Sequence, residues 1–554
     1  MVSFGLLWRT IRHLRPRQIG GQLRHRLRDR LRDPARFFAG DAGATPVVRR
    51  FRVPPLASLP GDNTREGLAH GSFRFVGESA GLGWPPDWQP AGRSKLWRYN
   101  LHYFDWIWLL EPAAAQLAVN DWIESYRPGR GRDGWEAYPV SLRTLNWISY
   151  FHGHHPEELT ARPEFAARLW ASLHEQLTWL AVRLEHHLGA NHLFENAAAL
   201  AYAGAAFDNP AAGGWLRQGL RLLKAEITEQ LPADGLHFER SPMYHLRILH
   251  LLLLLASVRH RELRALVEPA AARGLDALTQ VLHPDGGIAL LNDAALGVYP
   301  GAESLTAAAR ELELPLPQPG AGPFALEDAG YFGFRRGGDY VICDAGRVGP
   351  DYMPGHAHGD IFSFEMSVAG HRVVVDAGVH DYLDGELRAY CRSTRAHNTV
   401  EIEGRDQCEF WGAFRVGRRG RPHDVRWHPA ADGFELEGWH DGYRHLPGRP
   451  VHRRRFRRHA TGTFEVVDRV TARREVHVQS RIHLDPACTI LELTADRARI
   501  RHPGGELAVA FQGGGRLTRE PSIYCPRFGE QQHGTTLVYS AHGRRIDFGY
   551  RIAG

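Results

Sequence analysis

The chain has 554 residues, 43% of them hydrophobic and 23% charged, with a formal net charge of +6. A chain of this length is too long for one core, so we expect two or three domains of ordinary globular composition. Lys95 and Lys224 are the only lysines, so arginine carries almost all of the positive charge. Coding bias explains much of this preference, yet arginine also binds carboxylates and sulfates well, which suits an acidic substrate. Nucleic acid is not an expected partner, because no nucleic-acid-binding motif is present.

Signals for cross-linking and targeting are weak. The five cysteines all lie in the last two fifths of the chain without a Cys-x-x-Cys pair, which argues against a disulfide framework or a thiolate metal site. Residues 4–8 are too few for a secretory signal, and the longest apolar run, 251–256, is too short to span a bilayer. We therefore expect a cytoplasmic protein, with the periplasm or cell envelope as alternatives. The oligomeric state is left open.

Residues 1–95 are predicted to form a basic N-terminal helix and an irregular wrap that packs on the next domain. Residues 1–35 alternate leucine or isoleucine with arginine, and the pattern breaks near Pro16 and Gly20-Gly21. A basic amphipathic helix can lie on an anionic membrane surface. The commoner arrangement is a solvated helix with one face packed on its own domain; we favour it and keep peripheral membrane contact as the alternative.

Residues 96–320 are predicted to form a helical domain. Apolar residues recur there with the 3.6-residue period, and short loops rich in Gly, Pro and Asp separate the periodic segments. Many helices of similar length without intervening strands favour an array of helical hairpins, such as a toroid. The predicted helices are 104–126, 140–152, 164–187, 192–207, 212–231, 242–258 and 262–281.

Residues 321–554 are predicted to form an antiparallel β-sandwich. After the Pro/Gly-rich residues 317–320, short alternating strands separated by Gly-rich turns dominate the pattern. The predicted strands are 331–335, 340–344, 361–368, 372–376, 398–403, 455–458, 464–470 and 476–484. The expected fold class is therefore α+β, with helices first and strands second.

Three helix entrances in the helical domain carry aromatic, amide and arginine groups; they are residues 135–143, 191–196 and 234–245. In the second entrance, Asn191 stands where an N-cap would, and His192 and Glu195 share one helix face. Plain capping explains these residues equally well on their own. The third entrance, with Glu239 and Tyr244, holds more polar groups than a cap needs. Because aromatic faces stack on sugar rings and arginine binds acidic groups, the three entrances together indicate a saccharide site.

In the β half, residues 351–376 form the stretch richest in reactive side chains. It contains His356 and His358 and ends at Asp376, the last residue of a predicted hairpin. Two imidazoles in a His-x-His pair share one side of an extended backbone, and imidazole both binds metals and transfers protons near pH 7. The simpler alternative is two ordinary histidines in a chain that has 32 of them. His397 further along favours the functional interpretation.

These segments resemble the heparinase II/III family of polysaccharide lyases, together with related alginate and exopolysaccharide lyases. The shared motifs occur in family order within residues 95–430 and read NHLFEN, DGLHFERSPMYH, GHAHGD, VVVDAG and RSTRAHNTV. The resemblance implies an N-terminal (α/α) toroid joined to a C-terminal antiparallel β-sandwich. It also implies cleavage of a uronic-acid-containing anionic polysaccharide or oligosaccharide by β-elimination, between the two domains.

The resemblance further implies catalytic roles. Asn191 and His192 resemble the pair that faces the uronate carboxylate, and Glu195 resembles their support. Tyr244 resembles the tyrosine that protonates the glycosidic oxygen, or that acts as both base and acid on one epimer. His356 resembles the histidine base. These residue types suit an elimination, because the C5 proton is weakly acidic and the carboxylate must be neutralised before a base removes it.

Other residues are candidates for contact with the substrate. Tyr382 resembles a further active-site tyrosine, with Tyr390 as the competing assignment. Arg143 would suit an anionic chain, and Glu239 belongs to the polar entrance that carries Tyr244. With Glu195, these residues complete the predicted substrate-binding set.

The resemblance also implies one structural zinc ion held by His358, Asp376 and His397. Two imidazoles and a carboxylate are a plausible zinc set by ligand type. A tight hairpin at Gly370, however, would bring Asp376 near Glu365 and away from His358. The site therefore closes only if the GHAHGD segment folds back as a loop.

Two other functions stay open from the sequence. One is a glycoside hydrolase on the same toroid, with one carboxylate from Glu195 or Glu239 and the other from Asp133 or Glu136. Paired carboxylates at the separation that hydrolysis needs are less apparent than the elimination residues. The other is a weakly catalytic polysaccharide-binding protein of exopolysaccharide assembly. The joint presence of Asn191, Tyr244 and His356 argues against it.

Overall fold

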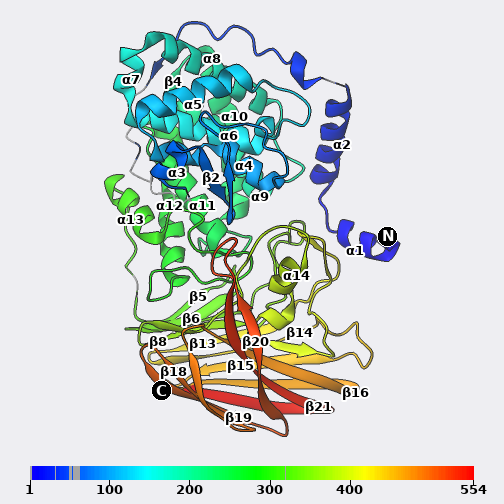
Figure 1. Cartoon of the computed structure of the whole chain (residues 1–554). Coiled ribbons are helices and arrows are strands. Elements are labelled where there is room, and N and C mark those ends of the chain that lie inside the picture. The colour runs from blue at the N-terminus through cyan, green and yellow to red at the C-terminus, as the bar shows by residue number, and fades with distance from the viewer. Residues whose placement is uncertain (1–2, 32, 49–52, 54–62, 319) are drawn as a thin grey trace.

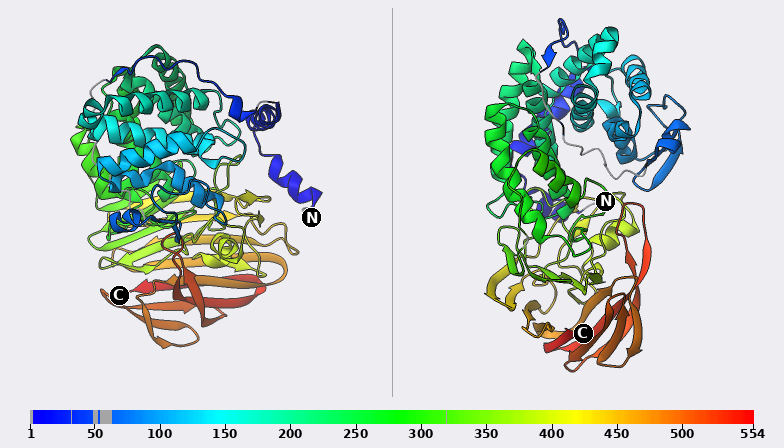
Figure 2. Two further views of the ribbon diagram at one scale, coloured as in Figure 1. Left: turned by 45° about the horizontal axis from the view of Figure 1, so that its top comes forward. Right: turned by 90° about the vertical axis from the view of Figure 1, so that its left-hand side faces the viewer.

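The computed structural model describes residues 3–31, 33–48, 53, 63–318 and 320–554. Helices make up the N-terminal region and strands the C-terminal region, and the two regions stack end to end (Figure 1). The second view of Figure 2 shows the helices as a curved, toroid-like array above the sheet. The predicted fold class, a helical toroid followed by an antiparallel β domain, is confirmed.

The helical region is built on long helices, several of which begin with proline at the first helical position, where a missing N–H costs nothing. Helix α11 is buried along its whole length. Within the described residues, no helix combines the length and apolarity that a membrane span requires. The helices of this region are α3 (Arg65–Ala69), α4 (Lys95–Tyr103), α5 (Pro112–Ser125), α6 (Ala137–Trp147), α7 (Pro156–Ala161), α8 (Pro163–Ala181), α9 (Ala190–Ala206), α10 (Pro210–Gln230), α11 (Pro242–Ala256), α12 (Arg261–Gln280) and α13 (Ala302–Glu311).

The predicted helix 104–126 is wrong in its first part. Phe104 adopts a left-handed conformation with φ of 61° and ends α4, and a 3₁₀ turn over Asp105–Leu109 follows. Helix α5 then begins at Pro112. A left-handed residue and a proline both interrupt an α-helix, so the apolar period alone overestimated its length.

Two N-terminal helices, α1 (Phe4–Ile11) and α2 (Pro16–Leu31), lie along one side of the molecule (Figure 1). Arg9 of α1 forms a 2.6 Å ion pair with Glu409 of the β domain, so the N-terminal segment does not pack on the helical region alone. Helix α2 packs on the helical region and runs unbroken through Gly21. The glycine allows this close packing, because a Cβ there would lie 3.0 Å from the backbone nitrogen of His187. The predicted break at the glycines is therefore wrong.

In the β domain, fifteen described strands form one continuous antiparallel network. The order along its main path is β17-β18-β19-β21-β16-β9-β8-β7-β6-β5, and β10, β13, β14, β15 and β20 pair beside this path. The predicted strands 464–470 and 476–484 are one strand, β16, with a register shift between Thr471 and Val476. Its strands are β5 (Gly322–Leu326), β6 (Tyr331–Arg336), β7 (Asp339–Asp344), β8 (Phe364–Val368), β9 (His371–Val374), β10 (Val400–Ile402), β13 (Pro422–Ala430), β14 (Gly433–His440), β15 (Val451–Arg458), β16 (Phe464–Leu484), β17 (Thr489–Leu493), β18 (Arg497–His502), β19 (Gly505–Gln512), β20 (Arg516–Tyr524) and β21 (Gln532–Ala553).

Short elements complete the chain. The small strand pairs are β1 (Val47–Val48) with β4 (Phe207–Asp208), β2 (Ser72–Phe75) with β3 (Glu78–Gly81), and β11 (Phe410–Trp411) with β12 (Arg415–Val416). Helix α14 (Glu386–Arg392) lies between the sheet and the helical region (Figure 1). The short turns are 3₁₀ segments at Pro34–Arg36, Asp133–Trp135 and Thr394–Ala396, and a π-helical segment at Ile148–His154.

The apolar core joins the two regions. The larger core cluster holds the buried faces of the helices and also Tyr331, Tyr340 and Ile342 from the first strands of the sheet. A second cluster fills the β domain. Because the first strands pack directly on the helical region, the helix entrances and the loop between β7 and β8 are held against each other.

Candidate active site and metal centre

Helix α9 presents Asn191 and His192 at its first turn. Gly189, with φ of 69°, occupies the N-cap position, so Asn191 lies inside the helix and not at the predicted cap. No described residue forms a side-chain hydrogen bond with its amide. The His192 side chain is 31% exposed, and its Nδ1 lies 3.3 Å from Glu185 Oε2, an ion-pair separation. The His192 ring is therefore available to a ligand, and Asn191 is 5% exposed beside it.

Glu185 is the carboxylate that controls His192. Burial alone would lower the pKa of His192, but the charge and hydrogen bond of Glu185, together with the charges of Glu239 and Glu195, outweigh burial and raise this pKa. The ring of Tyr138 lies 4.4 Å from the His192 ring and limits its orientation. Glu185 was not predicted, because it precedes the motif by six residues in an irregular segment.

Glu195 lies behind His192 on the same helix. It is fully buried and forms a two-point ion pair with Arg247 of α11, with separations of 2.5 and 2.7 Å. Tyr138, whose ring contacts His192, also donates a 3.3 Å hydrogen bond to it. Its carboxylate ties α9 to α11, and its predicted roles as support and as a substrate contact stay predictions.

Arg143 also lies in the interior of the helical region. It is fully buried, its guanidinium stacks 3.9 Å from the centre of the Trp122 ring, and it donates hydrogen bonds to Gln176 and to backbone carbonyls. Its aromatic and carbonyl neighbours anchor it inside the helical region. The predicted role in binding an anionic chain stays a prediction.

Tyr244, His356 and Tyr382 form one cluster across the two regions. Tyr244 lies in the first turn of α11, His356 in the loop after β7, and Tyr382 in the loop before α14. The rings of Tyr244 and His356 are 4.1 Å apart, and the hydroxyls of Tyr244 and Tyr382 are 3.0 Å apart. Burial, followed by the neighbouring Tyr382, raises the pKa of Tyr244 well above its usual value. Tyr390, the alternative to Tyr382, instead bonds the backbone of Ile523.

Asp293 contacts His356, His358 and Arg388 beside this cluster, and no local sequence signal predicted it. His356 Nδ1 and His358 Nε2 each lie 2.8 Å from one of its carboxylate oxygens, and Arg388 of α14 binds both oxygens. Burial opposes a charge on Asp293, but the Arg388 charge and the two histidine hydrogen bonds hold its pKa well below its usual value. An ionised carboxylate only accepts hydrogen bonds, so His356 carries its proton on Nδ1 and leaves Nε2 free as a base.

Glu239 lies beside the same histidine. Its carboxylate is 3.7 Å from His356 Nε2, and both of its buried oxygens lack a side-chain hydrogen-bond partner among the described residues, with the Asn191 backbone N–H nearby. Burial raises its pKa, against the opposing charges of His356 and His192. A protonated Glu239 can donate a hydrogen bond to an anionic ligand. The predicted place of Glu239 near the substrate stays a prediction.

His358, Asp376 and His397 come together as a buried group that could hold a metal ion, with one ligand atom from each lying within 4.8 Å of the others. The GHAHGD segment folds back as a loop, as this grouping requires. His358 Nδ1 and His397 Nε2 are buried without hydrogen-bond partners, as expected of atoms that ligate a metal. The other ring nitrogen of His358, Nε2, is hydrogen-bonded to the Asp293 carboxylate, which fixes the orientation of the His358 ring. The residues therefore fit a zinc ion.

Comparison with known proteins places the whole chain in one family. Residues 94–296 match the family model described as Heparinase II/III N-terminus, and residues 318–551 match Heparinase II/III-like, C-terminal. A heparin-sulfate lyase of Pedobacter heparinus is 27% identical over 278 residues, which are 44% of this chain and 40% of that protein. The alignment therefore spans less than half of that lyase.

A longer alignment joins the chain to FtsZ-localized protein C of Caulobacter vibrioides, which is 25% identical over 465 residues, 80% of this chain and 75% of that protein. Among solved structures, heparinase III superposes with a TM-score of 0.70 at 15% identity, covering 97% of this chain and 89% of that one. Heparan sulfate lyase HepC of Pedobacter heparinus superposes with a TM-score of 0.58 at 19% identity, over 97% and 88%. These superpositions establish a shared fold. Together with the matches of both domain models, they show that this chain belongs to the heparinase II/III-like family of polysaccharide lyases.

Proposed function

We propose that this protein cleaves a uronic-acid-containing anionic polysaccharide by β-elimination. The observation that carries the proposal is the contact of Tyr244 with His356 and Tyr382, from opposite regions of the chain. An elimination needs a base at C5 and an acid at the glycosidic oxygen of the same residue. His356 and Tyr244 supply such a pair at one place.

The substrate carboxylate has to be neutralised first. Removal of the C5 proton spreads negative charge onto that carboxylate, so hydrogen-bond donors and positive charge there lower the barrier. Asn191 offers an amide without a protein side-chain partner. His192 is kept toward its cationic form by Glu185, and Glu239 toward its neutral, donating form by burial. These three groups support binding of a uronate.

Proton transfer then follows from the two rings. His356 removes the C5 proton through Nε2, because its Nδ1 proton is bound to Asp293. The electron pair of the C5–H bond forms the C4–C5 double bond, and the C4–O4 bond breaks. Tyr244 donates its hydroxyl proton to the departing O4. Its raised pKa keeps that proton in place at neutral pH, which favours the acid role over the alternative role of base.

A zinc ion bound by His358, Asp376 and His397 would brace the loop that carries His356. When bound, it supplies structural coordination and no step of the reaction. His358 reaches Asp293 with its second ring nitrogen, and Asp293 also orients His356. The metal site and the base are therefore joined through one carboxylate.

A hydrolase mechanism has less support. Of the carboxylates that it could use, Glu195, Asp133 and Glu136 are each paired with an arginine or lysine. Glu239 is the remaining one, and no second unpaired carboxylate accompanies it among the residues predicted for hydrolysis. A general acid and base pair of two carboxylates is therefore poorly represented.

The test is a screen of uronate-containing polymers by ultraviolet absorbance. We expect wild-type protein to generate the absorbance of a C4–C5 unsaturated product, and Tyr244→Phe to lose it. Reduction of the uronates of a working polymer to neutral sugars should abolish cleavage, since no carboxylate remains to be neutralised. New reducing ends without absorbance would indicate hydrolysis. Binding without any cleavage would favour the polysaccharide-binding alternative.

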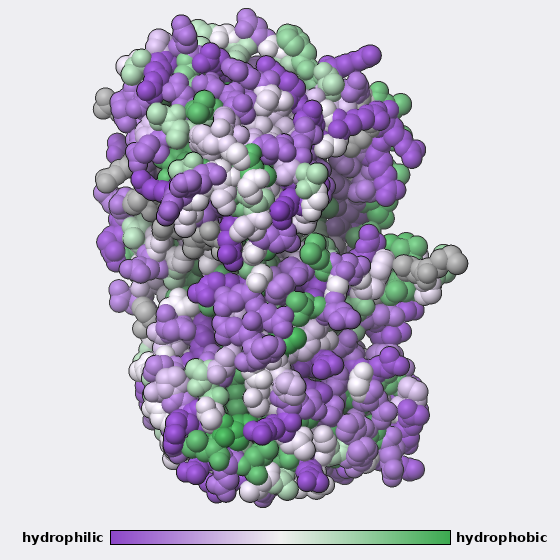
Figure 3. All heavy atoms as spheres, viewed as in Figure 1, coloured by the Kyte–Doolittle hydropathy of each residue, from purple (hydrophilic) through white to green (hydrophobic). Residues whose placement is uncertain are grey.

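The N-terminal helices support a second proposal, peripheral contact with an anionic membrane surface. Helix α1 contacts the β domain through the ion pair of Arg9 with Glu409, and helix α2 contacts the helical region through the stacked rings of His25 and His187. The opposite faces carry large apolar residues exposed to solvent at helical spacing, and arginines lie between them; they are Phe4, Leu7, Trp8, Ile11, Ile19, Leu23, Leu27 and Leu31. Figure 3 shows apolar and polar atoms alternating on these helices at the edge of the molecule. Such faces bind lipid by apolar insertion and by charge.

Vesicle co-sedimentation tests this contact. We expect binding to vesicles that contain phosphatidylglycerol and weak binding to phosphatidylcholine alone. Trp8→Ser with Leu23→Ser should lower the bound fraction by about tenfold, because two apolar anchors are lost. Leu117→Ser, at an exposed apolar position of the helical region, is the matched control. Equal binding by the double variant and the control would contradict the proposal.

A further inference from the structure

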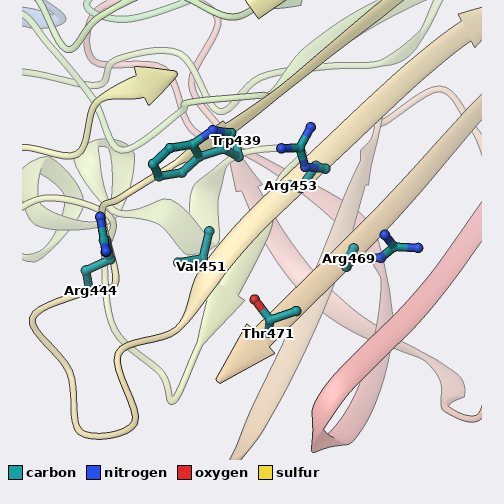
Figure 4. A pocket seen from close by; sticks show the side chains of 6 residues that line it. All are labelled: Trp439, Arg444, Val451, Arg453, Arg469 and Thr471. Atoms are coloured by element: carbon teal, nitrogen blue, oxygen red, sulfur yellow. The ribbon is translucent and has the colours of Figure 1, made fainter. Parts of the chain in front are cut away.

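The outer face of the β domain carries a hollow that the proposed reaction does not use. It measures about 290 Å³ and lies over β14, β15 and β16. Figure 4 shows Val451 and Thr471 between Arg444 and Arg469, with Trp439 and Arg453 beside them. Arginine and indole in one open hollow are the groups that bind a charged sugar chain.

Strand register places like charges side by side in this hollow. Arg453 of β15 is directly opposite Arg469 of β16 on one side and Trp439 of β14 on the other. Like charges opposite each other on antiparallel strands destabilise a sheet. Two residues along the same strand, Arg455 is instead opposite Glu437. Arg455 therefore has a carboxylate at its cross-strand position, although the ion pair of Glu437 is with Arg426, whereas Arg453 has none.

The acids around the hollow do not cancel its charge. Arg469 pairs with Asp547, but Arg545 lies 3.4 Å from the same carboxylate. Among the described residues, no carboxylate lies within ion-pair distance of Arg453 or Arg444. The hollow therefore keeps an excess of positive charge that an anion would neutralise.

Trp439 is held as a fixed platform at the edge of the hollow. Its indole nitrogen donates a 2.7 Å hydrogen bond to Asp424, and the His423 ring stacks on it at 4.3 Å. These contacts restrain the indole before a ligand arrives, so little side-chain entropy is lost on binding. A restrained aromatic surface suits stacking against the flat face of a sugar ring.

We propose that this hollow is a second binding site for an anionic saccharide chain, separate from the residues of the elimination. A sulfate or carboxylate of the chain binds Arg453 and Arg444, and the neighbouring sugar ring lies on Trp439. The choice of a saccharide rests on the proposed function, since it takes the occupant from the class of the substrate. The site holds the polymer on the β domain through contacts that do not depend on the catalytic cluster.

The test measures binding of heparin, a sulfated uronate-containing polymer, in the Tyr244→Phe background so that turnover does not interfere. We expect Arg453→Ser to weaken heparin binding by about tenfold, because an ionic hydrogen-bonding group is lost. Arg455→Ser removes the same charge from the same strand beside Glu437 and should change binding less than about twofold. Trp439→Ala should weaken heparin binding and leave the thermal midpoint nearly unchanged.

Arg453→Ser should also leave the thermal midpoint unchanged or raised, because it removes a like-charge neighbour. An equal loss of binding in Arg453→Ser and Arg455→Ser would overturn the site, as would no loss in Arg453→Ser. A loss of the same size toward single-stranded DNA would overturn the saccharide assignment. These outcomes are independent of catalysis: arginine-dependent heparin binding without cleavage of any uronate polymer supports this site and contradicts the elimination.

Discussion

His192, in the first turn of α9, leaves part of its ring open to a ligand, whereas Asp293, in the segment between α12 and α13 that faces the histidines of the β domain, is enclosed by protein partners. His192 is 31% exposed, while the side chains of Asp293 and His358 are fully buried. Exposed polar groups cost little when unpaired, but a buried charge has to be paired and hydrogen-bonded. The entrance of α9 can therefore meet a ligand, whereas Asp293 with Arg388 holds the two histidines of the β domain in place. Substitutions at the enclosed and at the exposed polar side chains test this difference.

The largest effect is expected at Asp293. Asp293→Asn removes the carboxylate that pairs with Arg388 and leaves a buried guanidinium uncompensated, which costs about 3–5 kcal/mol of unfolding free energy. Urea unfolding measures this loss, and activity on a working polymer should fall with it because His356 loses its fixed tautomer. Asp285→Asn, at a half-exposed carboxylate that pairs with Arg372, is the control and should cost much less. Equal costs would contradict the distinction between an enclosed and a half-exposed carboxylate.

The next effect separates chemistry from position within the cluster. Tyr244→Phe removes the hydroxyl and keeps the ring, so kcat should fall by about 10²–10⁴ with KM nearly unchanged, as expected for a group that acts in the transition state. His356→Ala should lower kcat by a similar factor and leave the zinc content unchanged. Tyr390→Phe is the matched control, because that hydroxyl bonds the Ile523 backbone outside the cluster. Near-normal kcat in Tyr244→Phe would point to Tyr382 as the acid.

A smaller effect tests the metal. His358→Ala should remove zinc from the protein, measured by elemental analysis, and lower the thermal midpoint, because metal-site energy is folding energy. A fall of about 5 °C would correspond to about 2 kcal/mol in a domain of this size. His452→Ala disrupts another buried histidine, bonded to Asp468, and should lower stability without changing the zinc content. Protein purified without chelator that contains no metal would contradict the assignment.

The smallest effect concerns pH. Glu185 helps to raise the pKa of His192 above its value in the unfolded chain. The stabilisation by the ion pair is therefore fully present below the unfolded pKa and is lost as the pH rises through the raised, folded-state pKa. Glu185→Gln should therefore move the alkaline limit of kcat/KM to lower pH and leave the acid limit in place. A pH–rate profile measures the shift. Glu175→Gln, at another partly buried glutamate of the helical region, should leave the profile unchanged.

The motif residues were predictable from the sequence, but their partners were not. NHLFEN and GHAHGD mark Asn191, His192, His356 and His358 because these side chains are crowded into short segments. Glu185, Asp293 and Arg388 stand apart in the chain, in segments without a local signal, and meet the motifs only after folding. The burial of Arg143 was equally invisible in the sequence. Its hydrogen bonds to carbonyls and its stacking on an indole join segments that are separate in the chain.

The amino-acid sequence by itself determined the change from helices to strands and the positions of the chemically rich segments. Both follow from local period and local composition, which tertiary contacts do not alter. Only the tertiary structure decided that Tyr244 meets His356, that Asp293 joins the base to the metal site, and that Arg453 faces Arg469. These pairings join segments of different elements, and their distances are set by how the helical region packs on the sheet and by strand register. The buried charged side chains have to be paired, because an unpaired buried charge would cost several kcal/mol of stability.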